Sequence, residues 1–293
     1  EWSPNFKNVT INNPAGVSMA GLTRIISGSL NLTNGTFSIG AGGSLTLDGA
    51  PLNRTNGFIA GTSTSDLAVT GTGANVLLPL SSSISLRNLT IGGTRTLLMN
   101  GTNNLSLYGA FSIANGATFD NGGESQIING GGSPSILISG KFLNRDKDNF
   151  TGTNGAIPGI VPSLNRNCTI EFGLAGNQVI TARNDYQNIT FSGSGNKTIA
   201  NSFTPLGTLY ITGSAIVDAR LHNIGDGSTL TNFSMDGGRL ILGTTGTQPN
   251  MVGAYTITGG IIEFASSQAS AQTIRNRAYL NIEVTGNNVG NSD

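Results

Sequence analysis

Short segments in which every second residue is large and apolar recur along the whole chain. Thr36-Phe37-Ser38-Ile39, Ser44-Leu45-Thr46-Leu47 and Asn104-Leu105-Ser106-Leu107 are examples, with Ser, Thr or Asn between the apolar positions. A period of two places successive side chains on opposite faces of a strand. Each segment therefore predicts a short β-strand with one buried face.

The segments between these strands are rich in Gly and Asn. Asn34-Gly35, Asn115-Gly116 and Asp236-Gly237-Gly238 are typical, and both residue types tolerate the positive φ of sharp turns. Hairpins with Asn-Gly turns, in a sandwich or an antiparallel barrel, are the main competing architecture. Strand segments of nearly constant length, without helical periodicity or long cross-connections, favour a parallel β-helix instead.

The expected fold is thus all-β, a right-handed parallel β-helix (β-solenoid) with one long loop excursion. Right-handedness follows from the general sense of parallel crossover connections. At roughly 20–25 residues per coil, the chain predicts about a dozen coils.

Four stretches share an aromatic residue or Leu, a variable residue, Asn and an alternating apolar strand. Their Asn residues are 80, 100 and 93 residues apart (88 − 8, 188 − 88 and 281 − 188). Stacked repeats bury a common core that no single unit could bury alone. We interpret the repeated Asn residues as an internal amide ladder and the repeated aromatic residues as an apolar contact set. The repeat residues are Phe6, Asn8, Asn88, Phe172, Tyr186, Asn188, Phe264, Tyr279 and Asn281.

Residues 140–167 interrupt this rhythm. The segment concentrates charge between Lys141 and Asp148, and it contains Pro158 and Pro162. We expect a loop insertion at 140–167. Loop insertions in solenoids often collect on one face and bind ligands, although a solvated connector is the equally simple interpretation.

The composition excludes some classes of function. Charged residues make up 10% of the chain, with 15 basic and 15 acidic residues and a formal net charge of zero, against roughly 25% in ordinary domains. Nucleic-acid binding needs clustered Lys and Arg, so it is not expected. No apolar run approaches the ~20 residues of a membrane span. The single cysteine, Cys168, excludes an intrachain disulfide and predicts a small buried side chain.

One short segment has the pattern of a calcium loop. Asn144, Asp146 and Asp148 place oxygen-bearing side chains at alternate positions, which is how hard cations are gathered. The interleaved Arg145 and Lys147 weaken that interpretation, and solvated loop charge is the alternative. Calcium is the only cofactor that the sequence indicates.

Catalytic chemistry has little support in the sequence. Glycoside hydrolysis needs two carboxylates roughly 5–10 Å apart, and no acidic pair lies in a recognisable catalytic motif. His222 is the only histidine, so a multi-histidine metal site is excluded. We therefore expect no enzyme and no catalytic residues. The carboxylates considered are Asp120 with Glu124, Asp146 with Asp148, Asp218 with Asp226, Asp236, Glu171 and Glu263.

A longer internal match leads to a resemblance. Thr169-Ile170-Glu171-Phe172 with Gln178 and Tyr186-Gln187-Asn188-Ile189 recurs as Ile261-Ile262-Glu263-Phe264 with Gln272 and Tyr279-Leu280-Asn281-Ile282. Together with Asn8-Val9-Thr10-Ile11-Asn12-Asn13, this resembles long repetitive secreted proteins of Bacteroidota that contain the phrase F/Y-x-N-L-T-I-N-N.

The resemblance implies a cell-surface, adhesin-like protein exported by the type IX secretion system, extracellular and attached to the cell surface. The secretion and surface-attachment machinery would be among its partners. The chain departs from the pattern at Glu283, which replaces the usual Thr, and its sequence lacks the carboxyl-terminal sorting domain of such proteins.

Both ends fall at nearly the same phase of the repeat. We therefore interpret residues 1–293 as one continuous solenoid section of a larger array, whose uncapped ends meet flanking repeats or neighbouring subunits. The leading hypothesis is a non-enzymatic structural or adhesive section that binds glycans or another cell surface. The alternatives are a polysaccharide-processing enzyme, a lyase or a glycosidase, and a filament subunit that assembles end to end.

Overall fold

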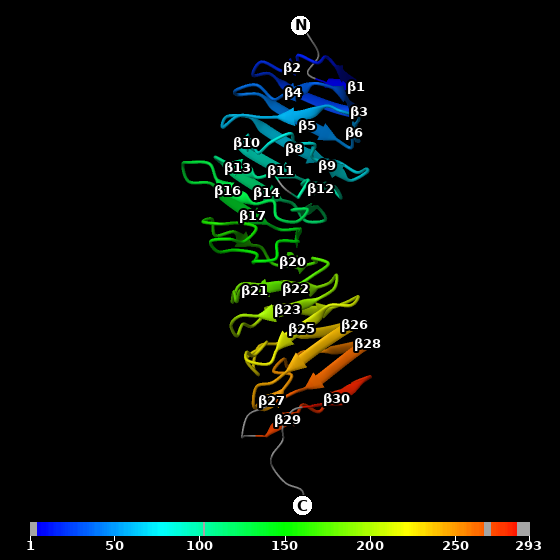
Figure 1. Cartoon of the computed structure of the whole chain (residues 1–293), viewed down its shortest axis with the longest axis vertical. Helices are drawn as coiled ribbons and strands as arrows, with labels where there is room; N and C mark the ends of the chain where they lie inside the picture. The colour runs from blue at the N-terminus through cyan, green and yellow to red at the C-terminus, as the bar shows by residue number, and fades with distance from the viewer. Residues whose placement is uncertain (1–4, 102, 267–270, 286–293) are drawn as a thin grey trace, which may run out of the picture. The chain divides into compact units, whose positions relative to one another are not determined.

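The computed structural model describes residues 5–101, 103–266 and 271–285, and every regular element in them is a β-strand (Figure 1). Each strand pair within them for which a register is defined runs parallel, for example β5 (Ser44–Asp48) with β8 (Asp66–Thr70). The strands stack as a β-solenoid of about twelve turns, which confirms the expected parallel architecture. Its right-handed sense stays a prediction.

The solenoid consists of two compact units. The first comprises Glu1–Asp146 and Thr151–Cys168, and the second comprises Lys147–Phe150 and Thr169–Asp293. The sequence pattern indicated one continuous section and showed no boundary at this point.

The first unit contains one long sheet, a ladder of four further strands and two small sheets. The long sheet contains β1 (Asn5–Asn12), β3 (Thr23–Asn34), β5, β8, β11 (Asn88–Ile91), β14 (Ala110–Ile113), β17 (Ser135–Ile138) and β19 (Ser163–Leu164), with β6 (Leu52–Arg54) also paired to β3. The ladder of four strands contains β9 (Val76–Leu77), β12 (Thr96–Leu98), β15 (Thr118–Asp120) and β18 (Lys141–Asn144), paired in that order. The small sheets are β2 (Val17–Ser18), β4 (Thr36–Ser38) and β7 (Phe58–Ala60), and β10 (Ile84–Leu86), β13 (Leu105–Leu107) and β16 (Ile127–Asn129).

Columns of apolar side chains form the core of the first unit. In successive coils, Leu45 lies opposite Leu67, Leu67 opposite Leu89, and Leu89 opposite Phe111. All four are at most 1% exposed. The alternation read from the sequence thus becomes one continuous buried column, because every coil presents the same phase to the interior.

The second unit repeats this arrangement with two ladders that meet in one long strand. One ladder contains β20 (Thr169–Phe172), β22 (Asn188–Phe191), β24 (Thr208–Ile211), β26 (Asn232–Leu242) and β28 (Tyr255–Phe264). The other contains β21 (Gln178–Ile180), β23 (Asn196–Ile199), β25 (Ile216–Ala219), the distal part of β26 and that of β28, and β30 (Ile282–Val284). A separate pair is β27 (Gly246–Gln248) with β29 (Gln272–Ile274).

A glycine pair lets β26 serve both ladders. Residues before Asp236 pair with β24, and residues from Arg239 onward pair with β25. Between them Gly238 has a φ of 70°, and a Cβ at Gly237 would lie 2.5 Å from the carbonyl oxygen of Gly213. The expected corner is confirmed here, and it lies within one strand because glycine allows the bend.

The segment 140–167 is more ordered than a loop excursion. It begins with strand β18 and ends with β19, and residues 145–162 between them contain only an isolated bridge, Thr151 to Ile157. Phe142, Phe150 and Ile157 are fully buried. The irregular stretch is therefore shorter than the predicted insertion, and its apolar side chains contribute to packed cores.

Candidate functional site

Several asparagines connect one coil to the next by accepting a hydrogen bond from a backbone N–H about one coil later in the chain. The Oδ1 atoms of Asn88, Asn188 and Asn232 accept hydrogen bonds from the N–H groups of Ala110, Thr208 and Ala254, at 2.8, 3.0 and 2.9 Å. Each donor lies one coil later in the chain. The asparagine side chain thus satisfies a backbone group at the start of the next strand.

A glycine precedes each of these three donors, and the contact requires it. A Cβ at Gly109, Gly207 or Gly253 would lie 2.5 to 2.7 Å from the Oδ1 of the bonded asparagine. It would also lie 2.5 to 2.9 Å from the carbonyl oxygen of the residue before that asparagine. We call the three pairs Asn88/Gly109, Asn188/Gly207 and Asn232/Gly253 the Asn–Gly links. Sequence analysis missed Asn232, although Thr231-Asn232-Phe233 has the same apolar alternation.

Asn8 and Asn281 occupy other columns. Asn8 lies opposite Ser29 and accepts a hydrogen bond from its hydroxyl at 3.1 Å. Asn8 shares the close approach of the Asn–Gly links, since a Cβ at Gly28 would lie 2.3 Å from its Oδ1. Asn88 also donates to the carboxylate of Asp66, one coil earlier, at 2.9 Å. Asn281 precedes the strand β30 and donates to the carbonyl oxygen of Gly260 at 3.0 Å. The four asparagine motifs are therefore not four copies of one structural position.

The amide ladder occurs in a different place from the one expected. The Nδ2 of Asn53 donates to the Oδ1 of Asn31 at 2.8 Å, and the Nδ2 of Asn31 donates to the hydroxyl of Thr10 at 3.3 Å. These residues lie on the outward face of the first unit, whereas the ladder was predicted to be internal. The repeated asparagines Asn88 and Asn188 bond to backbone instead.

The repeated tyrosines close their own turns. The hydroxyls of Tyr186 and Tyr279 donate to the carbonyl oxygens of Thr181 and Arg275, at 3.2 and 2.8 Å. Tyr255 does the same with Met251 at 3.0 Å. The rings also pack against one another or against Phe residues of neighbouring coils, at centroid distances of 5.3 to 6.4 Å. The apolar contact set expected from the sequence is therefore present in the second unit.

Phe172 and Phe264 are both buried, at 0% and 2% exposure, but in separate columns. Phe172 lies opposite Phe191, and Phe264 lies opposite Leu242 and Val284. Phe6 is only partly buried, with the Arg24 guanidinium 5.7 Å from its ring centre. The repeat residues are thus architectural, with individual rather than identical neighbours.

Two glutamines from the internal match have the same local role. The Oε1 of Gln178 accepts from the N–H of Leu174 at 3.1 Å, and that of Gln272 accepts from Ser266 at 3.3 Å. Gln178 also accepts from the fully buried Nζ of Lys197, which donates further to the carbonyl oxygens of Leu174 and Gly176. Burial lowers the pKa of Lys197 to about 8.

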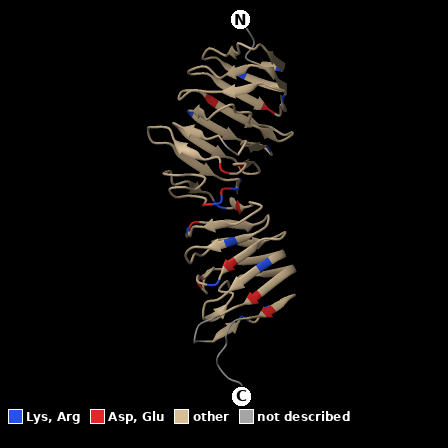
Figure 2. Cartoon of the chain, in the orientation of Figure 1, with Lys and Arg blue, Asp and Glu red and all other residues tan. Residues whose placement is uncertain are grey.

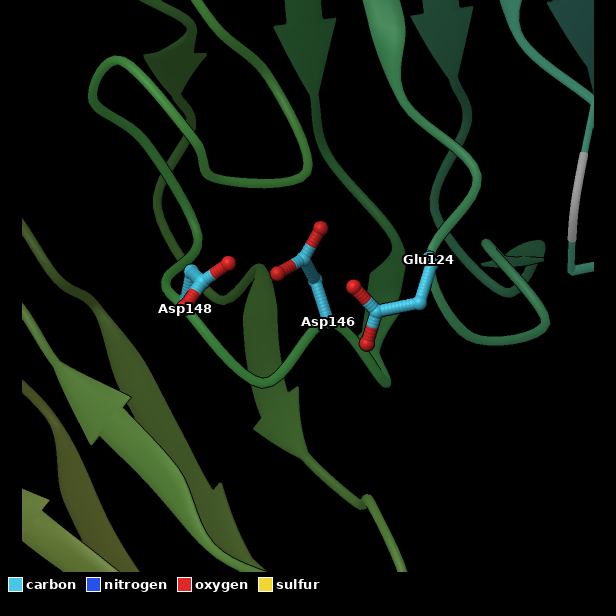
Figure 3. A group of neighbouring side chains, drawn as sticks. All are labelled: Glu124, Asp146 and Asp148. Carbon is cyan, nitrogen blue, oxygen red and sulfur yellow. The ribbon is translucent and has the colours of Figure 1, made fainter.

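The proposed calcium residues are only partly brought together. Carboxylate oxygens of Glu124, Asp146 and Asp148 lie within 4.8 Å of one another (Figure 3). Asn144 has another role, since its Oδ1 accepts a hydrogen bond from the N–H of Asp146 at 3.0 Å. The sequence pattern did not associate Glu124 with this group. The length of one coil could have indicated this neighbour, because β15 pairs with β18 and places Glu124 about one coil before Asp146.

The carboxylates considered for catalysis have basic or hydrogen-bonding partners. Both carboxylate oxygens of Asp120 accept from the Nε–H of Arg145, at 3.0 Å each. A hydrogen bond from Arg220 lowers the pKa of Asp218, and backbone hydrogen bonds from Thr229 and Ser228 lower that of Asp226. A catalytic acid near neutral pH needs a raised pKa. Asp218 and Asp226 have the opposite shift.

Glu263 belongs to a cluster of charges on the second unit. Its carboxylate accepts hydrogen bonds from Arg239 and from the Thr285 hydroxyl, both at 2.6 Å, and Arg239 also bonds Glu283 at 2.5 Å. The hydrogen bond from Thr285 lowers the pKa of Glu263 more than any other contact. Glu171, in the matched position of the earlier repeat, accepts from Ser192 at 2.6 Å instead.

Among the described residues, neither Cys168 nor His222 belongs to a group of possible metal ligands. Cys168 is fully buried, as expected for a small core residue. His222 is partly exposed in the turn after β25, where its N–H donates to the carbonyl oxygen of Ala219 at 3.4 Å.

The outward face of the second unit contains an open hollow of about 460 Å³. It lies over β22, β24, β26 and β28, and its lining side chains are mostly neutral and polar. In this lining the Tyr210 hydroxyl donates a hydrogen bond to the Asp236 Oδ2. That bond, joined by one from Thr212, lowers the pKa of Asp236. The lining residues are Asn188, Thr190, Thr208, Tyr210, Ser234, Asp236 and Thr258.

Charged residues are sparse along the described parts of both units (Figure 2). The described residues also include no helix long and apolar enough to cross a membrane. No family model matches the chain, and the comparisons with curated proteins and with solved structures found no match either. The functional argument therefore depends on the surfaces described above.

Proposed function

We propose that this chain is a non-enzymatic structural and adhesive section of a secreted, cell-surface repeat protein, and that it binds glycans. The observation that supports this most directly is the neutral polar row on the outward face of the second unit. Thr190, Tyr210, Ser234 and Thr256 lie opposite one another on four successive strands. Adjacent strands are ~4.8 Å apart, so such a row offers closely spaced hydrogen-bonding groups to the hydroxyls of a polysaccharide.

The non-enzymatic part of the proposal draws on the carboxylates. Asp218, Asp226, Asp236 and Glu263 all have a lowered pKa, each because hydrogen bonds favour the ionised form. A polysaccharide hydrolase needs one carboxyl group that remains protonated to donate a proton to the leaving group. The surface location and type IX export follow from the sequence resemblance and form part of the same proposal.

The test is retention of the purified chain on immobilised polysaccharides, with and without calcium, while released sugar fragments are measured. Retention without fragments is the expected result. Fragment release would contradict the non-enzymatic assignment, and failure to be retained on any polysaccharide would contradict the adhesive one.

A filament subunit is a second candidate, supported by apolar surfaces on the terminal strands. A hollow of about 300 Å³ beside β1 is lined mainly by apolar side chains, among them Phe6, Val9 and Phe37. At β30, Ile282 and Val284 are 45% and 63% exposed, although their partners Ile262 and Phe264 are buried. Sedimentation velocity over a range of protein concentrations tests this candidate. Growing oligomers would support it, and a concentration-independent monomer would contradict it.

A further inference from the structure

Tyr210 is an aromatic side chain on the outward face of the second unit. Its chain neighbours Leu209 and Ile211 are fully buried, so the strand alternation directs Tyr210 away from the core. Phe191 on β22 and Phe233 on β26 are at most 1% exposed and lie on the opposite face. The ring of Tyr210 therefore contributes to the surface, and the packing of the solenoid does not explain its presence.

The Tyr210 ring is held in one orientation. The register places Ser234 directly opposite Tyr210 on β26, yet the hydroxyl bonds to Asp236, two residues further along that strand. The ring consequently extends diagonally towards β26 and is tethered at its far end. A side chain fixed before binding loses less conformational entropy when a ligand arrives.

Short side chains surround the ring. Thr190 lies opposite Tyr210 on one side and Ser234 on the other, and Thr208 and Thr258 complete the lining of the hollow nearby. The ring thus stands beside a floor of hydroxyl groups. An apolar surface with a few convergent polar groups is the usual composition of a small-ligand site.

We propose that this hollow is a glycan subsite in which the Tyr210 ring stacks against a neutral sugar. The apolar C–H face of a pyranose matches the aromatic ring, and its hydroxyls can donate to the Asp236 carboxylate or exchange hydrogen bonds with Thr190 and Ser234. Asp236 is the one charged group in the lining, and Glu171 lies next in the same row opposite Thr190. Two carboxylates repel an anionic sugar, so the site favours neutral glycans over uronic acids.

This inference rests on the proposed adhesive function and assigns it to particular residues. The probes are cellohexaose, laminarihexaose, mannohexaose and xylohexaose, with hexagalacturonate as the anionic comparison, and affinity is measured by isothermal titration calorimetry. We expect at least one neutral hexasaccharide to bind and hexagalacturonate to bind more weakly. Tyr210→Ala should weaken binding about tenfold, the loss of one aromatic contact worth ~1.4 kcal/mol.

Two further variants separate the ring from its tether. Tyr210→Phe keeps the ring and loses the bond to Asp236, and Asp236→Asn keeps an acceptor but removes the charge. Both variants should weaken binding by less than Tyr210→Ala does. Asp236→Asn should also bring the affinity for hexagalacturonate closer to that for the neutral hexasaccharides. Tyr108→Ala, the same change at a partly exposed tyrosine of the first unit, should leave affinity unchanged. Circular dichroism and unfolding temperature confirm that each variant is folded.

The outcomes distinguish the two proposals. If the wild-type chain binds neutral glycans and Tyr210→Ala binds them equally well, the hollow is not the subsite, and the adhesive function stands. If hexagalacturonate binds best, the preference for neutral sugars is wrong. If the wild-type chain binds none of the hexasaccharides and is retained on no polysaccharide, both proposals are overturned.

Discussion

The Asn188 side chain accepts a hydrogen bond from the N–H of Thr208, one coil later, at 3.0 Å. Gly207, the residue just before Thr208, has no side chain, and a Cβ there would lie 2.5 Å from the Asn188 Oδ1. The geometry thus constrains two residues in successive coils together. The same relationship recurs at Asn88 with Gly109 and at Asn232 with Gly253.

The Asn–Gly link predicts unequal costs for its two members. Asn188→Ala should lower the free energy of unfolding by about 1 kcal/mol, because one hydrogen bond is lost. Gly207→Ala should cost more, about 1–3 kcal/mol, because the new Cβ meets both the asparagine side chain and the carbonyl oxygen of Gln187. Urea denaturation measures both changes.

The double variant tests the steric explanation. Asn188→Ala with Gly207→Ala should cost less than the sum of the single changes, because removing the asparagine relieves one of the two close contacts. Asn196→Ala, at an exposed asparagine of the same unit, is the matched control and should change stability little. Strict additivity in the double variant would contradict the direct contact.

Lys197 predicts a rise in stability with pH. Its folded pKa is lowered to about 8 by burial, whereas an unfolded lysine has a pKa of about 10.4. Between these values the unfolded chain holds more protons than the folded one, so the free energy of unfolding increases with pH. Burial also raises the pKa of the Tyr186 hydroxyl. This group lowers the free energy of unfolding only above the ordinary phenol pKa of about 10, where the unfolded chain begins to lose its phenolic proton.

Chemical denaturation at several pH values from about 8 to 10 measures this effect. The wild-type chain should show the rise, and Lys197→Met should remove it. Lys7→Met changes an exposed lysine and should keep the wild-type slope. An unchanged slope in Lys197→Met would show that another group is responsible.

The sequence predicted calcium at Asn144, Asp146 and Asp148, and the structure groups the last two with Glu124 instead of Asn144. Calcium binding at this carboxylate group has a direct test. Calcium at roughly 1 mM, the range of weak extracellular sites, should raise the unfolding temperature by a few degrees, because a ligand that binds only the folded state stabilises it. Glu124→Gln should abolish the rise, and Asp185→Asn, at an exposed carboxylate paired with Arg183, should keep it. An unfolding temperature that does not respond to calcium in the wild-type chain would contradict the site.

Much of the architecture was predictable from local alternation. The apolar phase of residues 44–47 and the glycine corner within β26 were both identified correctly, because each depends on a few consecutive residues. The sequence wrongly predicted that Asn8 and Asn88 occupy equivalent positions. Followed back coil by coil, the register leads from Asn88 to Thr23. Asn8 lies opposite Ser29 instead, so the two similar phrases fall on different columns.

The candidate surfaces were the least predictable part. The alternation places Tyr210 on the outward face, between the buried Leu209 and Ile211. Only the pairing of β24 with β26 brings it to Asp236. Glu124 likewise meets Asp146 only through the stacking of coils. Neither pair is close in sequence, so no motif search over neighbouring residues would associate its members.

The sequence by itself determined the strand period, the glycine turns and hence a parallel β-solenoid, because these depend on local sterics and on which residues avoid water. Tertiary structure alone decided the coil register. The coils differ in length, as the pairing of Leu137 with Ser163 and that of Thr169 with Asn188 illustrate. These differences shift the alignment as coils accumulate, and the register sets which side chains become neighbours. The Asn–Gly links, the buried hydrogen bonds of Lys197 and the hollow at Tyr210 exist because of that register.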